Sequence, residues 1–213
     1  MPESAIRMNE KTTRVRISGI IALFFIFINT TAFAGGLYIS EFGTPSMGVA
    51  AAGAQAVASD ASTAFHNPAG MTRLGGKQLM LTGGALYSTV KFDPDDNTPI
   101  AGNNGGDAGG PAPILGQFYV HSLSDRLKLG ANIISITGAV LDYDNDWTGR
   151  YLNTDITLLT ITLNPTLAYR VTDWLSIGAG PQIMYANIEM KLRAPPPIGT
   201  GKVEIDGDDV AFG

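Results

Sequence analysis

The chain has 213 residues, of which 26 are glycine, 12 are proline and only 15% are charged, and its formal net charge is −5. An acidic chain is a poor candidate for binding nucleic acid, which requires a basic surface. The absence of cysteine excludes a disulfide framework. The length allows one domain, or one domain with a small appendage, and so low a content of charge is compatible with a surface that faces lipid.

The first 34 residues have the three parts of a secretory signal peptide. Basic residues precede the mostly apolar run Ile17 to Ile28, and the small residues Ala32 and Ala34 then stand at the −3 and −1 positions of a cleavage site. The apolar run is shorter than the ~20 residues that a membrane-spanning helix needs, so a cleaved signal is favoured over a retained anchor. We predict an exported mature chain that starts at Gly35.

Residues 35–76 are rich in small residues and contain few that favour strands. Because so little apolar bulk cannot form an independent core, this segment is predicted to pack against another part of the protein. It contains Asn67-Pro68-Ala69, in which the proline fixes its own φ and keeps the preceding residue out of the helical region. The tripeptide is either a simple Asn-Pro turn or a rigid point from which the Asn67 amide bonds to a wall or to the segment's own backbone. A water channel is excluded, because it needs several apolar helices.

From Lys77 onward, apolar stretches of about ten residues alternate with clusters of turn-forming residues. The clearest is Thr157 to Arg170, whose odd positions are mostly apolar and whose even positions are mostly polar. Strands of ~9–11 residues with two such faces are typical of a membrane barrel, whereas soluble sandwiches have strands of ~5–6 residues. The sequence therefore predicts an all-β, antiparallel transmembrane β-barrel. Strands are expected near residues 77–91, 113–122, 127–139, 156–170 and 174–188.

The predicted connections differ between the two ends of the strands. SDRLKLG (residues 124–130) and TDWLSIG (172–178) are near copies that place a short turn before a strand, whereas residues 93–112 and 141–155 are long polar loops. Short turns at one end and long loops at the other are typical of outer-membrane barrels. Five strands, with a sixth beginning near Val210 after Asp206-Gly207-Asp208-Asp209, are too few to close a barrel. We therefore predict that the sequence is the N-terminal part of a longer chain.

Residues 48–74, GVAAAGAQAVASDASTAFHNPAGMTRL, resemble the long-chain fatty acid transporter (FadL) family of outer-membrane proteins, which includes relatives that admit aromatic hydrocarbons. Asp60-Ala61-Ser62 and Asn67-Pro68-Ala69 carry most of the resemblance. It implies a fourteen-stranded barrel whose lumen is plugged by an N-terminal hatch. Hydrophobic ligands are captured outside, enter a pocket in the barrel and leave sideways into the bilayer. Movement of the hatch and an inward kink in the third strand open that route, and transport is passive.

The resemblance divides the chain into a signal peptide (residues 1–34), a hatch (35–76) and the first part of a barrel (77–213). It favours a gating or docking role for Asn67, Pro68 and Ala69 over a mere turn. The apolar hatch residues either line the ligand pocket or pack the plug, and the second use is favoured. These residues are Leu37, Phe42 and Phe65. A fatty acid carboxylate would need a cation, for which Arg150 and Arg170 are candidates.

The third predicted strand changes phase. Its apolar residues stand at odd positions up to Ile133 and at even positions from Ile134 onward. A shift of one residue is what a β-bulge produces, so Ile133 and Ile134 are predicted to mark the lateral kink. The alternative is that a strand containing Gly and Ser simply alternates poorly.

Residues Asp142, Asp144 and Asp146 have the spacing that opens a calcium loop. Trp147 and Asn153, however, stand where that loop requires Gly and Glu. A solvated acidic loop is favoured, and no metal site is predicted.

Asp60, Ser62 and His66 are the residue types of a hydrolase triad, but they lie within one short segment, whereas triad partners converge from separate elements. The chain also lacks the G-x-S-x-G motif. We therefore predict neither an enzyme nor a cofactor.

Together these observations predict a monomeric protein of the Gram-negative outer membrane that imports hydrophobic compounds, with long-chain fatty acids as the first candidate. Its other partners would be outer-membrane lipid and lipopolysaccharide, and nucleic acid is not among them. A general barrel with a structural or adhesive role is the main alternative, and an outer-membrane lipase is the enzymatic one. The sequence does not separate fatty acids from aromatic hydrocarbons as ligands.

Overall fold

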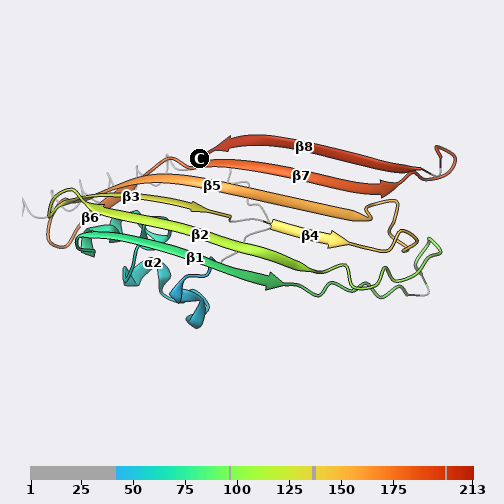
Figure 1. Cartoon of the computed structure of the whole chain (residues 1–213), viewed down its shortest axis with the longest axis horizontal. Helices are drawn as coiled ribbons and strands as arrows, with labels where there is room; N and C mark the ends of the chain where they lie inside the picture. Colours follow the sequence, from blue (N-terminus) through green and yellow to red (C-terminus); the bar gives the residue numbers. More distant parts are fainter. Residues whose placement is uncertain (1–41, 96, 136–137, 200) are drawn as a thin grey trace, which may run out of the picture. The chain divides into compact units, whose positions relative to one another are not determined.

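The computed structural model describes residues 42–95, 97–135, 138–199 and 201–213. The predicted signal peptide, its cleavage site and Leu37 lie outside the described residues. A helical segment, residues 42–76, is followed by one antiparallel sheet (Figure 1). Within the described part of the chain, no helix has the length and apolar character needed to cross a membrane.

The helical segment consists of short helices: η1 (Pro45–Val49), α2 (Ala54–Val57), α3 (Thr63–His66) and η2 (Pro68–Arg73). Asn67 separates the last two and has an extended backbone, with φ −160° and ψ 90°, as expected for a residue that precedes proline. Pro68 opens η2 at a position where the missing N–H costs no hydrogen bond. The proline therefore divides what would otherwise be a single helix.

The described strands of the sheet are β1 (Lys77–Tyr87), β2 (Pro111–Ser122), β3 (Leu127–Ile134), β4 (Gly138–Asp142), β5 (Asp155–Arg170), β6 (Ser176–Ala179), β7 (Ile183–Arg193) and β8 (Lys202–Phe212). Their order is β1-β2-β3-β5-β7-β8, and β4 and β6 also pair with β5. All described pairings between these strands are antiparallel. β3 and β4 pair with successive parts of one edge of β5, and β6 and β7 pair with successive parts of its other edge. Strands that follow one another along the chain are therefore neighbours in the sheet, as in a β-meander.

The five predicted strands are present, although the third and fifth are each divided in two. The predicted start of the sixth strand near Val210 was wrong: β8 begins at Lys202, and Asp206 to Asp209 lie inside it, paired with residues Ala186 to Glu189 of β7. Turn-forming residues are held extended here because the neighbouring strand supplies backbone partners.

The two near-copy segments form equivalent short turns. Ser124 Oγ accepts a hydrogen bond from the backbone N–H of Leu127, and Thr172 Oγ1 accepts one from that of Leu175, both at 3.0 Å. The helical segment lies toward the end of the sheet that carries these turns, and the long loops lie at the opposite end (Figure 1). The predicted asymmetry of the connections is therefore confirmed.

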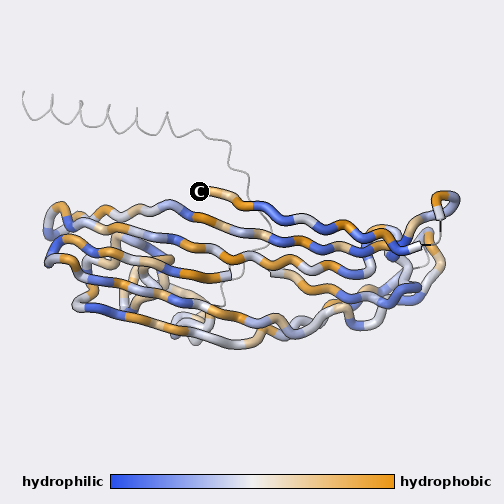
Figure 2. The backbone as a smooth tube through the Cα atoms, turned by 45° about the horizontal axis from the view of Figure 1, so that its top comes forward, coloured by the Kyte–Doolittle hydropathy of each residue, from blue (hydrophilic) through white to orange (hydrophobic). Residues whose placement is uncertain are grey.

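The strands have two different faces, as the alternation in Figure 2 shows. We call the face that packs against the helical segment the inner face; on β2, β3 and β5 it carries the even-numbered side chains. Buried polar residues lie on it, namely Lys128, Asn132, Thr160, Thr162 and Thr166. The outer face carries exposed apolar residues, among them Leu115, Ile133, Leu159, Ile161, Leu163 and Leu167. Apolar residues outside and polar residues inside are typical of a membrane barrel wall.

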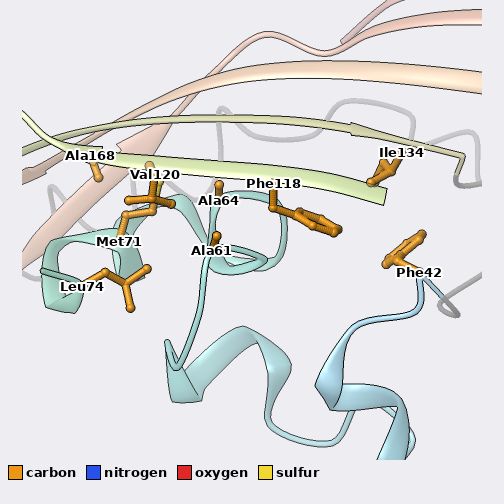
Figure 3. Close-up of a cluster of buried hydrophobic side chains, with 9 residues drawn as sticks. All are labelled: Phe42, Ala61, Ala64, Met71, Leu74, Phe118, Val120, Ile134 and Ala168. Carbon is orange, nitrogen blue, oxygen red and sulfur yellow. The ribbon is translucent and has the colours of Figure 1, made fainter. Parts of the chain in front are cut away.

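A hydrophobic cluster joins the helical segment to the inner face (Figure 3). The segment contributes Phe42, Ala61, Ala64, Met71 and Leu74, and the strands contribute Phe118, Val120, Ile134 and Ala168. Phe42, Met71 and Phe118 are fully buried. Burial of each such large side chain contributes roughly 1.5–3 kcal/mol, so the segment obtains from the sheet the core that it lacks by itself.

Candidate functional site

Polar contacts supplement this cluster and tie the helical segment to three strands. Thr72 Oγ1 lies 2.8 Å from Ser176 Oγ of β6, and its carbonyl accepts a hydrogen bond from the Arg170 guanidinium of β5. The Thr82 hydroxyl of β1 donates to the carbonyl of Phe42. Arg170, one of the two predicted carboxylate partners, is thus engaged in holding the segment.

Two glycines on the inner face let the segment approach the wall closely. A Cβ added to Gly178 of β6 would meet the backbone of Pro68 and Ala69, and one added to Gly130 of β3 would lie only 2.5 Å from the Met71 sulfur. Two residues of the Asn67-Pro68-Ala69 tripeptide therefore lie directly against the wall, because a glycine stands opposite them.

Asn67 itself bonds within the segment. Its side-chain amide donates to the carbonyl of Gln55 at 2.8 Å, and its backbone carbonyl accepts from the N–H of Gly70 at 2.8 Å. Two kinds of partner were predicted for the Asn67 side-chain amide, the wall and the segment's own backbone. The amide bonds to the segment's own backbone. This hydrogen bond connects α2 to the start of η2. The tripeptide therefore combines a brace within the segment, made by Asn67, with a contact to the wall, made by Pro68 and Ala69.

The aromatic residues of the segment belong to its core. Phe42 and Phe65 pack edge to face with ring centroids 5.1 Å apart. Phe65 also packs edge to face with His66, at 5.3 Å. Phe42 lies in the hydrophobic cluster and Phe65 packs against it, so in this structure both fill space between the segment and the sheet.

The residue types of a hydrolase triad are not arranged as a triad. Ser62 Oγ donates to Asp60 Oδ1 at 2.5 Å, and the backbone N–H of Ser62 donates to the same oxygen at 2.9 Å, which is the geometry of a local turn. His66 Nε2 is buried without a hydrogen-bond partner. Burial lowers the pKa of His66 below its ordinary value of 6.5, and the charge of Asp60 opposes the shift.

The third strand line changes register between Ile134 and Gly138. Ile134 pairs with Thr162 of β5, and the next pair joins Gly138 to Leu159. Between these two pairs, the third strand line advances by four residues and β5 by three. A difference of one residue is the offset of a β-bulge. Of the two residues that the sequence singled out, Ile133 points outward and is exposed, whereas Ile134 points inward and is buried.

Near the long loops, the inner face carries apolar rows that the sequence analysis did not identify. Register places Leu141 of β4, Ile156 of β5, Met190 of β7 and Ile205 of β8 side by side across the sheet. Leu158 and Ile188 form the next row. A signal for these rows was available, since between Ile156 and Leu163 apolar residues occupy both odd and even positions.

At the same height, the outer face of β7 and β8 is polar. Lys191 Nζ lies 2.6 Å from Glu189 and 3.8 Å from Glu204. Thr157 pairs with Glu189 on this face. Since the two apolar rows lie on the inner face, contact with lipid does not explain them.

The two long loops pack together around Trp147. Its indole stacks on Tyr143 with centroids 4.0 Å apart and donates to the carbonyl of Asn153 at 2.7 Å. Asn103 of the first loop exchanges backbone hydrogen bonds with residues 146 and 148 of the second. The side chains of Asp142, Asp144 and Asp146 remain exposed. Among the described residues, no group of three or more His, Asp or Glu is placed to hold a metal ion.

Arg150, the other predicted carboxylate partner, helps to join these loops. Its guanidinium donates to the carbonyls of Ala101 and Trp147, at 2.8 and 3.0 Å. With Asp146 and Arg193 it also lines a cavity of about 250 Å³.

These features are those of a plugged wall from an outer-membrane transport barrel: an antiparallel meander with an apolar outer face, and a small helical segment held against its inner face. The chain belongs to the family described as outer membrane protein transport protein (OMPP1/FadL/TodX), whose model matches residues 25–211.

Curated relatives agree with this membership. The chain is 28% identical over 191 residues to the long-chain fatty acid transport protein of Escherichia coli K12, covering 86% of this chain and 41% of the relative. It is 28% identical over 175 residues to outer membrane protein P1 of Haemophilus influenzae, covering 76% and 38%. The chain thus spans about two-fifths of the length of these relatives.

A solved structure shares the fold. The crystal structure of a Pseudomonas aeruginosa FadL homologue matches with a TM-score of 0.71 at 24% identity, over 84% of this chain and 48% of the homologue.

Proposed function

We propose that this chain supplies the hatch and the first wall strands of an outer-membrane protein that transports hydrophobic compounds passively, with long-chain fatty acids as the first candidate. The observation that carries this proposal is the pair of apolar rows on the inner face of the sheet. An apolar surface that faces neither lipid nor the described helical segment is suited to an apolar ligand.

The other parts have roles that fit such a route. The Asn67-Pro68-Ala69 tripeptide would act as the docking point of the gate, since it combines the brace to Gln55 with the contact to Gly178. The register shift between Ile134 and Gly138 would mark the lateral exit, because a bulge locally disrupts the ladder and bends the strand. The polar outer rim would lie among lipopolysaccharide head groups. The protein would act as a monomer without catalysis, after removal of residues 1–34 as a signal peptide.

The proposal is tested by uptake of labelled oleate into cells that lack their own fatty acid importer and produce the protein with or without single substitutions. Ile156→Asp places a charge in the inner apolar row, where an apolar ligand cannot solvate it. Thr157→Asp places the same charge on the outer rim, one residue away. We expect uptake in the unmodified protein, a loss of about tenfold or more in Ile156→Asp, and no loss in Thr157→Asp.

Equal uptake in both variants would remove the inner rows from the ligand route. A folded protein that imports neither oleate nor toluene would favour a structural or adhesive barrel instead, and hydrolysis of a chromogenic ester by the purified protein would favour a lipase.

A further inference from the structure

A groove lies on the outer face of the sheet, near the end that carries the short turns. Its volume is about 400 Å³, within the ~300–1,000 Å³ range of small-ligand sites. The residues that line it include Leu127 of β3, Leu167 and Tyr169 of β5, and Ile177 and Ala179 of β6. These five side chains are aliphatic or aromatic, and we call this feature the outer groove.

Strand register and one small side chain form the outer groove. Register sets Leu127, Tyr169 and Ile177 in one row across the three strands. Leu167 and Ala179 are paired in the next row. Ala179 ends β6 and presents only a methyl group beside these larger neighbours, which leaves a hollow in the wall.

The outer groove opens toward lipid. It lies on the face that an outer-membrane barrel turns to the bilayer, and two of its large side chains, Leu167 and Ile177, are 52% and 56% exposed. Because lipid tails are as apolar as these side chains, burial by itself does not retain a chain here. A chain that fills a hollow, however, gains van der Waals contacts over one that crosses a flat wall. The occupant that continues this lipid-facing surface is therefore an acyl chain.

Polar groups lie at the turn end of the outer groove. Tyr169 is 43% exposed, and tyrosine rings on the outer face are typical of the membrane–water interface. Arg126 directly precedes Leu127, and its carbonyl accepts a hydrogen bond from the backbone N–H of Arg170 at 2.9 Å. In the part of the chain that the structure describes, no hydrogen bond or ion pair engages the Arg126 guanidinium. A free guanidinium is suited to binding phosphate.

Acidic residues accompany Arg126. Asp125 lies in the same turn and Asp173 in the turn between β5 and β6, and both are exposed. Carboxylates repel a phosphate and attract an ammonium group. The two turns therefore complement a head group that carries both a phosphate and an amine better than one that carries only negative charge.

We propose that the outer groove binds one acyl chain of a zwitterionic glycerophospholipid, whose phosphate pairs with Arg126 and whose ester region contacts Tyr169. The site lies on the lipid side of the wall, so it is distinct from the inner apolar rows proposed for the transported ligand. It gives the protein a resident lipid at the end that carries the short turns. The inference goes beyond the proposed transport function and does not depend on it.

The test uses photoreactive lipids and the purified protein in micelles of a non-ionic detergent. Phosphatidylethanolamine with a diazirine in one acyl chain is added and activated by light, and the labelled peptides are identified by mass spectrometry. We expect labelling to concentrate on residues 167–179. Phosphatidylglycerol with the same acyl chains lacks the amine and should label this segment about two- to fivefold less.

Two variants with the same added ring separate the outer groove from the rest of the wall. Ala179→Phe fills the groove from the lipid side. Ala85→Phe places the ring at an exposed position of β1, which is paired with Pro113 on the outer face. We expect Ala179→Phe to lower labelling of residues 167–179 about three- to fivefold, and Ala85→Phe to leave it unchanged.

A second pair of variants tests the head group. Arg126→Gln removes the cation beside the outer groove, and Lys77→Gln removes an exposed cation at the same end of the sheet. We expect Arg126→Gln to lower labelling by phosphatidylethanolamine about two- to fivefold, and Lys77→Gln to leave it unchanged.

Folding of each variant is checked by heat-modifiable electrophoretic mobility, and if Ala179→Phe fails to fold, Ala179→Leu decides. Labelling that spreads evenly over the outer face, or that persists in a folded variant with a filled groove, would overturn the inference. Equal labelling by the two head groups would overturn the choice of a zwitterionic lipid. Displacement of the photoreactive lipid by an equal amount of oleate would assign the outer groove to the transported ligand instead.

Discussion

At the scale of single residues, His66 shows how the helical segment depends on its surroundings. Its ring lies 5.3 Å from Phe65 and 6.2 Å from Phe42, and its Nε2 has no partner. This apolar environment favours the neutral imidazole and lowers the pKa of His66, although Asp60 attracts the charged form. Protonation should therefore weaken the packing of the segment against the sheet.

The pH dependence follows from the direction of this shift. Above pH 6.5, the ordinary pKa of the group, His66 is neutral in both states and its packing is fully effective. As the pH falls below this value, the unfolded state takes up a proton before the folded state does. The free energy of unfolding therefore decreases until the pH has fallen below the lower pKa of the folded state. Because His66 is only partly buried, water screens part of this effect.

We therefore expect the apparent melting temperature to decrease between pH 7.5 and pH 5 more steeply in the native protein than in His66→Gln, which cannot gain this charge. The difference between the two curves isolates the histidine from the other titrating groups. Parallel curves would show that His66 is neutralised or solvated in the folded state to the same degree as in the unfolded chain.

At the scale of elements, the docking of η2 on β6 depends on a side chain that is absent. Gly178 faces the backbone of Pro68 and Ala69, and the neighbouring Ser176 contacts Thr72. The wall is thus shaped to the segment at this point, and even one methyl group would force the two elements apart.

Gly178→Ala is expected to cost about 1–3 kcal/mol of stability and to expose residues 60–74 to protease. The matched control is Gly84→Ala in β1, where an added Cβ would have nothing within 4 Å; it should be neutral or stabilise by up to about 1 kcal/mol. Limited proteolysis with mass spectrometry measures the exposure. Equal protection of the segment in both variants would show that the wall accommodates the methyl group by moving.

At the scale of the whole described molecule, the two faces of the sheet meet different surroundings. Ile161 on the outer face is 47% exposed, whereas its neighbour Thr160 on the inner face is 3% exposed. In a membrane barrel the first side chain contacts lipid and the second does not.

Because the chain has no cysteine, single cysteines report on these surroundings directly. A fluorophore on Ile161→Cys should be quenched strongly by brominated lipids in reconstituted membranes, and one on Thr160→Cys should be quenched weakly. Similar quenching at the two adjacent positions would contradict the assignment of the faces.

Much of the wall was predictable because its signals are local. Alternation from Leu159 to Tyr169 has a period of two, and the turns at Ser124 and Thr172 are set by side chains within three residues. Asp206 to Asp209 misled the prediction because turn propensity is also local, whereas the pairing of β8 with β7 is not. The apolar row from Leu141 to Ile205 was missed because its members come from four strands and meet only through register.

The sequence by itself determined the class of the protein: apolar alternation and a segment with too little apolar bulk to fold alone specify a two-faced wall and a dependent plug. Only the tertiary structure decided which residues meet. It placed Gly178 against Pro68 and Ala69, directed the Asn67 amide to Gln55, and set Asn132 opposite Asn164. The physical reason is that periodicity fixes the face on which a side chain lies, whereas strand register and close packing fix its neighbours.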